Sequence, residues 1–279
     1  MVKIPTKRQY RTHLRKHAQY ATSDDWVNWC ADIAELRANR IVTLLKEYKP
    51  IDAHVLDLGC GIGLTISILA QHYKNCVGCD IDAKYVKATR ELLSIVGIRK
   101  KVLKYDAKVL PFAAKSFDVV TSLEVIEHAS NPEVMLREAK RVLKKDGILV
   151  ITTANKWWPI EPHFKLLFLS YLPTKIADMY VKASGKGTSY DNIKLPSYTE
   201  FRSVVEKYFI IEDVTLDIIR EYNKYGLSKE RGSKVVIVGS LLKVLYKLRR
   251  TRLAIIYTVA SWLLLRVSLG WVFVGRPKK

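Results

Sequence analysis

The stretch VLDLGCGIGLTISILA, residues 55–70, constrains the fold of this chain more than any other. A short apolar run contains Asp57, and Gly59, Gly61 and Gly63 follow within six positions, before an apolar pattern with helical spacing begins. Glycine lets a backbone approach a ligand closely, and the first turn of a helix offers free N–H groups. The stretch therefore predicts a strand, a tight turn and a helix that bind a nucleotide-type ligand at the carboxyl edge of a sheet.

Short apolar runs alternate with segments of helical spacing along most of the chain. The predicted strands cover residues 53–58, 74–79, 100–105, 117–122, 147–153, 208–216 and 234–241. The predicted helices between them cover residues 64–72, 83–96, 132–143 and 199–207. This alternation is typical of a parallel sheet covered by helices on both faces. The expected fold class is α/β, a Rossmann-like seven-stranded sheet followed by a C-terminal hydrophobic helical extension.

Three segments are predicted along the chain. Residues 1–50 form a helical segment, residues 51–242 form the sheet domain, and residues 243–279 form a basic and hydrophobic tail. Residues 155–198 interrupt the strand–helix rhythm and are rich in aromatic residues and proline. We interpret them as an insertion on the substrate side of the domain, although ordinary capping helices explain this composition equally well.

Acidic residues end the second and third predicted strands. Asp80 stands where a carboxylate can accept hydrogen bonds from both hydroxyls of a ribose. Asp106 stands where it could accept a hydrogen bond from an exocyclic amine. Together with Asp57 and the glycines, this succession resembles the class I S-adenosylmethionine-dependent methyltransferases, and the resemblance covers roughly residues 50–155.

The resemblance implies S-adenosylmethionine as cofactor and indicates which residues hold it. Asp57 and the three glycines match the positions that hold the methionine portion. Asp80 matches the ribose-binding position, and Ile81 beside it is included among the predicted cofactor-binding residues. Asp106 and the backbone of Ala107 match the adenine-binding positions.

The segment that follows the fourth strand carries the candidate catalytic groups, Glu124-Val-Ile-Glu127-His128. Transfer to a hydroxyl requires that its proton be removed or its oxygen polarised. Glu127 and His128 are the predicted catalytic residues. Together with Glu124 they are also candidate ligands of a divalent cation such as Mg²⁺, which would lower the pKa of the hydroxyl. In the alternative, no metal binds, and His128 acts as the base or helps to shape the site.

Two families share this local pattern. The ubiquinone-biosynthesis O-methyltransferases are similar from Val119 through Asn155, including the turn from His128 to Pro132. The small-RNA 3′-terminal 2′-O-methyltransferases carry E-x-x-E-H as metal ligands, with a further histidine downstream. His163 is the candidate for that position, but its surroundings match neither family.

The net charge of the chain and its predicted C-terminal tail help to indicate which kind of molecule is methylated. The chain has 47 Lys and Arg against 27 Asp and Glu, a net charge of +20, which indicates an anionic partner such as nucleic acid or a membrane surface. Nine basic residues and no acidic residue lie within residues 243–279, around the apolar stretch 253–275. As one helix this stretch would be long enough to cross a bilayer. Because Arg266 lies within it, an embedded hairpin competes with a span, and a helix packed on the domain is a further alternative.

We therefore expect a methyltransferase that acts on a hydroxyl of a lipidic acceptor, such as an isoprenoid quinone precursor or a lipid-linked molecule. The expected location is the cytoplasmic side of a membrane with an anionic surface, and the tail is expected to make the association. RNA 2′-O-methylation and small-molecule methylation are the alternatives, but no RNA-binding module is recognisable. A cofactor-binding scaffold without activity is a further alternative, and the sequence predicts no oligomeric state.

The remaining cysteines and histidines carry no recognisable motif. Cys76 and Cys79 lie in a predicted strand, where alternation points them to opposite faces, so we expect core residues and not a metal or redox pair. Four histidines are interpreted as surface or packing residues: His13, His17, His54 and His72.

Overall fold

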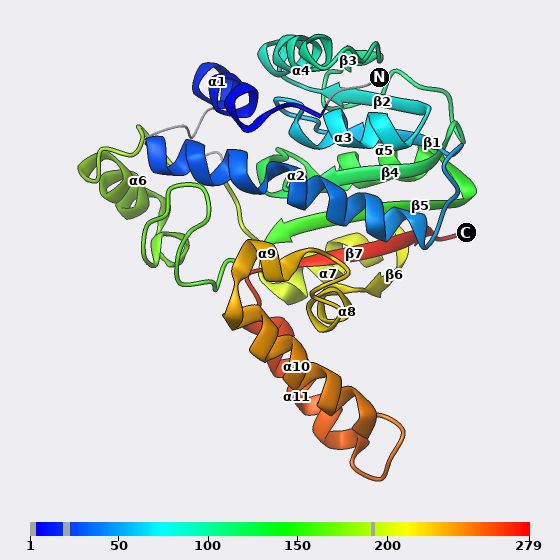
Figure 1. Cartoon of the computed structure of the whole chain (residues 1–279), viewed down its shortest axis with the longest axis vertical. Helices are drawn as coiled ribbons and strands as arrows, with labels where there is room; N and C mark the ends of the chain where they lie inside the picture. Colours follow the sequence, from blue (N-terminus) through cyan, green and yellow to red (C-terminus); the bar gives the residue numbers. More distant parts are fainter. Residues whose placement is uncertain (1–3, 19–22, 191–192) are drawn as a thin grey trace.

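The computed structural model describes residues 4–18, 23–190 and 193–279, and its centre is a mixed seven-stranded sheet (Figure 1). The strands are β1 (His54–Leu58), β2 (Asn75–Asp80), β3 (Val102–Lys104), β4 (Phe117–Leu123), β5 (Leu143–Ala154), β6 (Phe209–Asp213) and β7 (Gly270–Pro277). Their order is β3-β2-β1-β4-β5-β7-β6, and β7 runs antiparallel to both of its neighbours while the other pairs are parallel. The predicted Rossmann-like α/β fold is confirmed.

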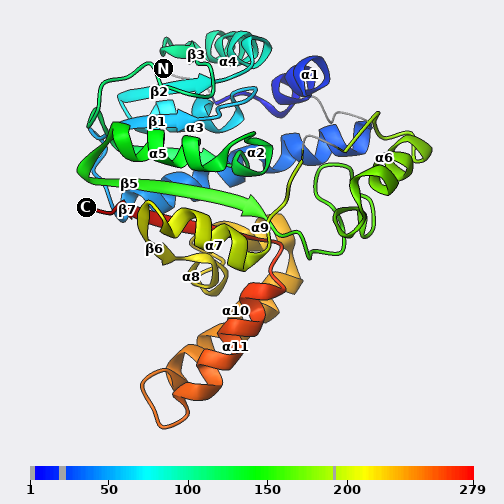
Figure 2. The ribbon, with the colours of Figure 1, turned by 180° about the vertical axis from the view of Figure 1, so that it is seen from behind.

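Helices cover both faces of this sheet. They are α1 (Lys7–His17), α2 (Asp24–Lys46), α3 (Leu64–His72), α4 (Ala83–Ile95), α5 (Pro132–Val142), α6 (Thr174–Ala183), α7 (Tyr198–Glu206), α8 (Thr215–Arg220), α9 (Leu227–Arg231), α10 (Ser233–Leu248) and α11 (Ala254–Arg266). On one face α2, α3 and α8 bury their apolar sides, and on the other α5 and α7 do so (Figures 1 and 2). Because strand residues alternate, Val55 of β1 enters the first core and Leu56 enters the second.

The same alternation explains the two cysteines of β2. Cys76 belongs to the first core and Cys79 to the second, and both are free thiols. Burial raises the pKa of each thiol above its ordinary value, so neither is a thiolate at neutral pH. The expectation that they are core residues is confirmed.

Side-chain caps fix where several helices begin. Thr6 and Gln9 form a reciprocal capping box at the start of α1, and Ser197 and Glu200 form another at the start of α7. At α5, Asn131 accepts a hydrogen bond from the N–H of Val134, and a proline follows in the first turn. These caps satisfy N–H groups that the first turn leaves unpaired.

The expected strand at residues 234–241 is wrong, because these residues belong to helix α10. Their exposed apolar residues recur at helical spacing, as Ile237, Leu241 and Val244 show. The sheet is instead completed by β7, which lies inside the segment expected to be a separate tail and pairs with β5 and β6. Trp271 and Phe273 of β7, two residues apart, are both fully buried on one face of the sheet.

The apolar stretch 253–275 is therefore not one helix. Its first part is α11, which ends at Arg266, and its last part is β7. Helices α10 and α11 pair with each other and project from the body as a long hairpin (Figures 1 and 2). Within the described residues, none of the helices has the length and apolar character needed to cross a membrane.

The insertion at residues 155–198 has a small apolar core of its own. Phe164, Leu169 and Val181 are buried in it, and α6 supplies part of its wall. This core adjoins the end of β5 at Ala154, so the insertion sits beside the carboxyl edge of the sheet.

We predict that the Trp271→Ala substitution in β7 lowers the free energy of unfolding by about 3–5 kcal/mol, since this side chain is 1% exposed and its removal leaves a large cavity. Urea unfolding followed by circular dichroism measures the loss. Arg276→Ala, at an exposed position of the same strand, is the control and should change it by less than about 0.5 kcal/mol. Equal, small effects of both substitutions would contradict the placement of β7 inside the sheet.

Candidate active site

The glycine turn between β1 and α3 is held against the end of β2. The N–H groups of Gly59 and Cys60 donate to the carbonyl oxygen of Cys79 at 2.8 and 3.0 Å. The N–H of Gly61 donates to Oδ2 of Asp80 at 2.9 Å. The turn is therefore fixed by its own backbone to the carboxyl edge of the sheet.

Each glycine of the turn has a positive φ, at 76°, 53° and 92° in chain order, which other residues rarely adopt. A Cβ atom on Gly59 would lie 2.5 Å from Cγ2 of Val125, and one on Gly63 would lie 3.0 Å from Cα of Thr89. A Cβ atom on Gly61 would meet nothing within 4 Å. The turn is thus packed at both ends and open in the middle, where a ligand can approach its backbone.

Asp57, at the end of β1, is buried with one carboxylate oxygen unsatisfied. Its Oδ1 accepts a hydrogen bond from the hydroxyl of Thr121 at 2.7 Å, whereas its buried Oδ2 has no partner among the described residues. Burial raises the pKa of this carboxyl from 3.8 to about 6, partly offset by the Thr121 hydrogen bond and reinforced by Asp80. A cationic ligand at Oδ2 would supply the missing partner.

Asp80, at the end of β2, is buried and turned toward the glycine turn. Its two oxygens accept hydrogen bonds from the N–H groups of Gly61 and Asp82, each at 2.9 Å. Burial raises its pKa above the ordinary value, and these hydrogen bonds counteract the rise. The next side chain, Ile81, is half exposed and places an apolar surface beside the carboxylate.

Asp106 and Ala107 follow β3 in an exposed loop. Oδ1 of Asp106 accepts hydrogen bonds from the N–H groups of Val109 and Lys108, which lower the pKa of the carboxyl. Ala107 has a φ of 63°, the left-handed conformation. The structure brings Asp57, Asp80 and the glycine turn into direct contact, and it leaves Asp106 further along the same edge.

Glu124 and Glu127 follow β4 in different environments. Glu124 is exposed and has a φ of 56°, and its carboxylate accepts a hydrogen bond from the hydroxyl of Thr152 at 3.1 Å. Glu127 is buried, with Oε2 accepting from the hydroxyl of Thr153 at 3.1 Å and Oε1 unsatisfied among the described residues. Burial, reinforced by Glu124, raises the pKa of Glu127 well above 4.5. A hydrogen-bond donor or a cation at Oε1 would supply the partner that this buried carboxyl lacks.

His128 and His163 meet beside this buried carboxyl. Their ring centroids are 5.1 Å apart, nearly perpendicular, and one ligand atom from each lies within 4.8 Å of the others and of a Glu127 oxygen. The ring of His163 is oriented by Glu161, which is fully buried and whose Oε1 lies 2.6 Å from Nδ1. The structure thus gathers Glu127 and His128 with His163, whereas Glu124 lies outside this group.

The aromatic residues of the insertion separate into two sets. Phe164 is inside the small core, but Trp157 and Phe168 are 50% and 52% exposed. Both contact Tyr171 edge to face, with centroid distances of 5.3 and 5.4 Å. These three rings form an exposed apolar surface on the carboxyl side of the sheet.

Sequence reasoning missed the side chains that orient the acidic groups. Thr121 and Thr153 hydrogen-bond Asp57 and Glu127, and both are buried strand residues that look like ordinary sheet positions. Glu161 precedes His163 by two residues, and this spacing was the one signal that could have identified it.

Comparisons with known proteins agree with this geometry. Residues 56–151 match the family model described as a methyltransferase domain. An uncharacterised protein of Methanocaldococcus jannaschii is 40% identical over 40% of this chain and 42% of its own length. A ubiquinone biosynthesis O-methyltransferase of Pelagibacter ubique is 32% identical over 39% of this chain and 45% of its own. A 2-methyl-6-phytyl-1,4-hydroquinone methyltransferase of Synechocystis is 40% identical over 38% of this chain and 34% of its own.

The similarity to these curated relatives spans less than half of their length. Two solved structures share the fold over most of the chain, each at 16% identity and a TM-score of 0.51. The YcgJ protein of Bacillus subtilis covers 86% of this chain and 99% of its own, and a Pyrococcus horikoshii protein covers 96% and 99%. With their glycine turn, their acidic strand ends and the matching domain model, residues 56–151 form a methyltransferase domain of the class I S-adenosylmethionine-dependent type.

Proposed function

We propose that this protein transfers the methyl group of S-adenosylmethionine to a hydroxyl of a lipidic acceptor at a membrane surface. The observation that carries the first part is the buried, unsatisfied Oδ2 of Asp57 beside a backbone turn that is open at Gly61. A nucleoside with a cationic amino acid portion fits this arrangement, because Asp57 would receive the positive charge and Asp80 the ribose hydroxyls.

When bound, S-adenosylmethionine supplies an electrophilic methyl group. The chain's own residues then have to hold the acceptor in line and manage its proton. Glu127 and His128 lie at the exit of β4, next to the glycine turn through the contact of Val125 with Gly59. With no cation bound, they would be the groups that take a hydroxyl proton, with the His128 imidazole as the base.

A divalent cation such as Mg²⁺ is part of the proposal. Glu127 and His128, joined by His163, would hold it, since one carboxylate oxygen and two imidazoles converge there. Glu161 would keep the His163 ring in orientation, as carboxylates do for many metal-binding histidines. The cation would supply Lewis-acid polarisation of the acceptor oxygen.

A lipidic acceptor is favoured by the exposed rings of Trp157, Phe168 and Tyr171. They offer an apolar surface beside the carboxyl edge, where an acceptor must enter. Two relatives are named for methylating intermediates of quinone-type lipids, which supports the same class of acceptor here.

The hairpin of α10 and α11 supports association with a membrane. Its exposed large apolar side chains include Leu241, Val244, Val259 and Trp262. Residues 233–266 carry seven Lys or Arg and no acidic residue. A hairpin of this kind can lie in the headgroup region, with its apolar side inward and its cations at anionic headgroups.

The position of Arg266 is more compatible with a hairpin that lies in the headgroup region than with a helix that crosses the membrane. Its guanidinium stacks 3.7 Å from the ring centroid of Trp262 and lies over Tyr198 of the body at 5.6 Å. This residue is therefore at the root of the hairpin, and the tip carries Arg249, Arg250 and Arg252. The expected cytoplasmic side of the membrane is part of this proposal.

We predict that the purified protein binds S-adenosylhomocysteine in isothermal titration calorimetry and that Asp80→Asn weakens binding at least about tenfold, because hydrogen bonds to a charged group are lost. Asp82→Asn is the matched control, since asparagine keeps the N-cap of α4.

Affinity for S-adenosylmethionine should fall as pH drops below about 6, where Asp57 becomes protonated, and Asp57→Asn should remove this dependence. No binding by the native protein would refute the cofactor assignment.

We predict that a chelator lowers transfer of labelled methyl to membrane lipid extract and that Mg²⁺ restores it. Glu127→Gln should abolish this restoration, because it removes the one carboxylate that converges with the two histidines. Glu124→Gln is the matched control and should keep it. Full activity in chelator would exclude a metal, and labelling of RNA in place of lipid would replace the proposed acceptor.

We predict that the protein co-sediments with phosphatidylglycerol vesicles and much less with phosphatidylcholine vesicles. Changing Arg249, Arg250 and Arg252 to Gln should weaken the partition about 100-fold, at roughly 1 kcal/mol for each cation. Val259→Ser with Trp262→Ser should weaken binding to both vesicle types, because apolar contact is lost. Ile210→Ser, at an exposed apolar site of β6, is the control. Unchanged binding in the hairpin variants, or self-association through the hairpin, would contradict the proposal.

A further inference from the structure

Helix α1 lies against the outside of the glycine turn through a buried histidine. His13 is 2% exposed, and its Nε2 lies 2.7 Å from the carbonyl oxygen of Ile62. A carbonyl can only accept, so Nε2 carries the proton and Nδ1 presents its lone pair in the neutral ring. Nδ1 is buried and has no hydrogen-bond partner among the described residues.

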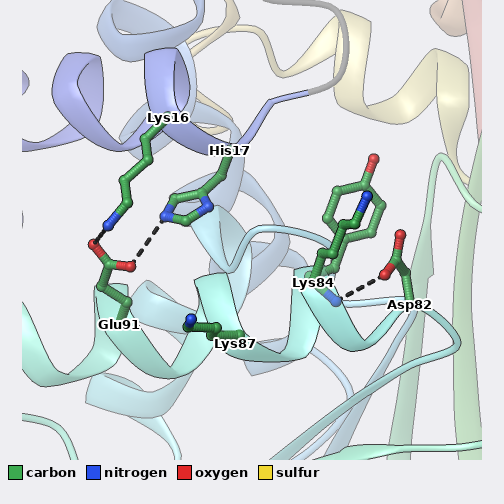
Figure 3. A pocket seen from close by; sticks show the side chains of 7 residues that line it. Lys16, His17, Asp82, Lys84, Lys87 and Glu91 are labelled. Atoms are coloured by element: carbon green, nitrogen blue, oxygen red, sulfur yellow. Dashed lines mark hydrogen bonds and ion pairs between the residues drawn. The ribbon is translucent and has the colours of Figure 1, made fainter.

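Two further ligand-type side chains lie beside His13. His17 is one helical turn after His13, in the stretch HLRKH, and their ring centroids are 4.7 Å apart. Glu91 approaches His17 from α4, and its Oε2 lies 3.1 Å from Nε2 of His17 (Figure 3). One ligand atom from each of the three residues lies within 4.8 Å of the other two.

We propose that Nδ1 of His13, His17 and Glu91 form a binding site for Zn²⁺ or a similar transition-metal ion, separate from the Glu127 group. Two imidazoles and one carboxylate are a common zinc ligand set, and ligands of a tetrahedral zinc ion lie about 3.3 Å apart. The hydrogen bond from His13 to a backbone carbonyl is the contact that typically orients a metal-binding histidine. A water molecule would complete the coordination.

The bound ion would join three parts of the chain. α1 and α4 would be cross-linked directly, and the glycine turn would be held through the contact between His13 and Ile62. The proposal does not depend on the acceptor or on methyl transfer, because the ligands are positioned by α1 and α4 alone.

Lys16 competes with a metal for the same carboxylate. Its ammonium donates to Oε1 of Glu91 at 2.7 Å, and Lys84 and Lys87 line the same hollow (Figure 3). The Lys16 side chain is 59% exposed, so it can leave Glu91 for water when a cation binds. Removing Lys16 should therefore leave zinc affinity unchanged or increase it.

The experiment uses the full chain carrying His128→Ala, which removes one histidine from the other candidate metal group. The protein is freed of metal with a chelator and titrated with Zn²⁺ by calorimetry, and Co²⁺ binding is followed by its visible absorption. We expect one ion per chain and a rise in Tm of about 5 °C when zinc is at 100 times its Kd. His17→Ala and Glu91→Gln should each weaken zinc binding more than about 100-fold, since direct ligands matter more than their outer partners.

Controls separate a metal site from a simple ion-pair network. Lys16→Ala breaks the ion pair but keeps all three ligands, and His72→Ala removes a histidine of α3 outside the cluster. Both should bind zinc as tightly as the parent protein or more tightly. No stoichiometric zinc binding, equal binding after Glu91→Gln, or weaker binding after Lys16→Ala would overturn the proposal.

Discussion

The structure depends on the way the backbone after β1 is tied to the end of β2. Three N–H groups of the glycine turn donate to Cys79 and Asp80, so two neighbouring strand ends become one rigid edge. Only positive φ angles allow this path, which is why the sequence needs glycine there. The same turn leaves its central position open, packs against Val125 next to the candidate catalytic segment and is touched from outside by α1. The proposed cofactor site, the candidate catalytic residues and the outer helix therefore all meet at one loop.

Most of the sheet could be predicted because its strands are recognisable from the local sequence pattern. β1, β2 and β4 are apolar runs followed by helical patterns, and β1 pairs with β2, as β4 does with β5, the next strand along the chain. β7 could not be recognised in this way, since it is reached only after two helices that look like part of the same apolar tail. Its pairing with β5 joins Ala154 to Gly270, and such distant pairing leaves no mark in the local pattern.

Some residues of the candidate site could likewise be predicted from a local pattern, and others could not. The acidic strand ends and the glycines were predictable, because a motif fixes their spacing. The partners of the histidines were not, because His163 reaches His128 only through the fold of the insertion, and His13 and His17 meet Glu91 only through the packing of α1 on α4. Histidines without a motif were interpreted as surface or packing residues, and His13 is buried as a packing residue would be, but its unsatisfied Nδ1 is the basis of the metal site proposed above. That this nitrogen is buried without a partner among the described residues cannot be read from the sequence.

The position of the hairpin ahead of β7 also sets an order of events during synthesis. The two projecting helices emerge from the ribosome before the strand that fills the gap between β5 and β6. Until that strand arrives, β5 and β6 each expose an unpaired edge, which is a site for mispairing with other chains. A nascent chain whose hairpin had already settled on lipid would keep these open edges apart from those of its neighbours, so the membrane contact proposed for the hairpin would also protect the assembly of the sheet.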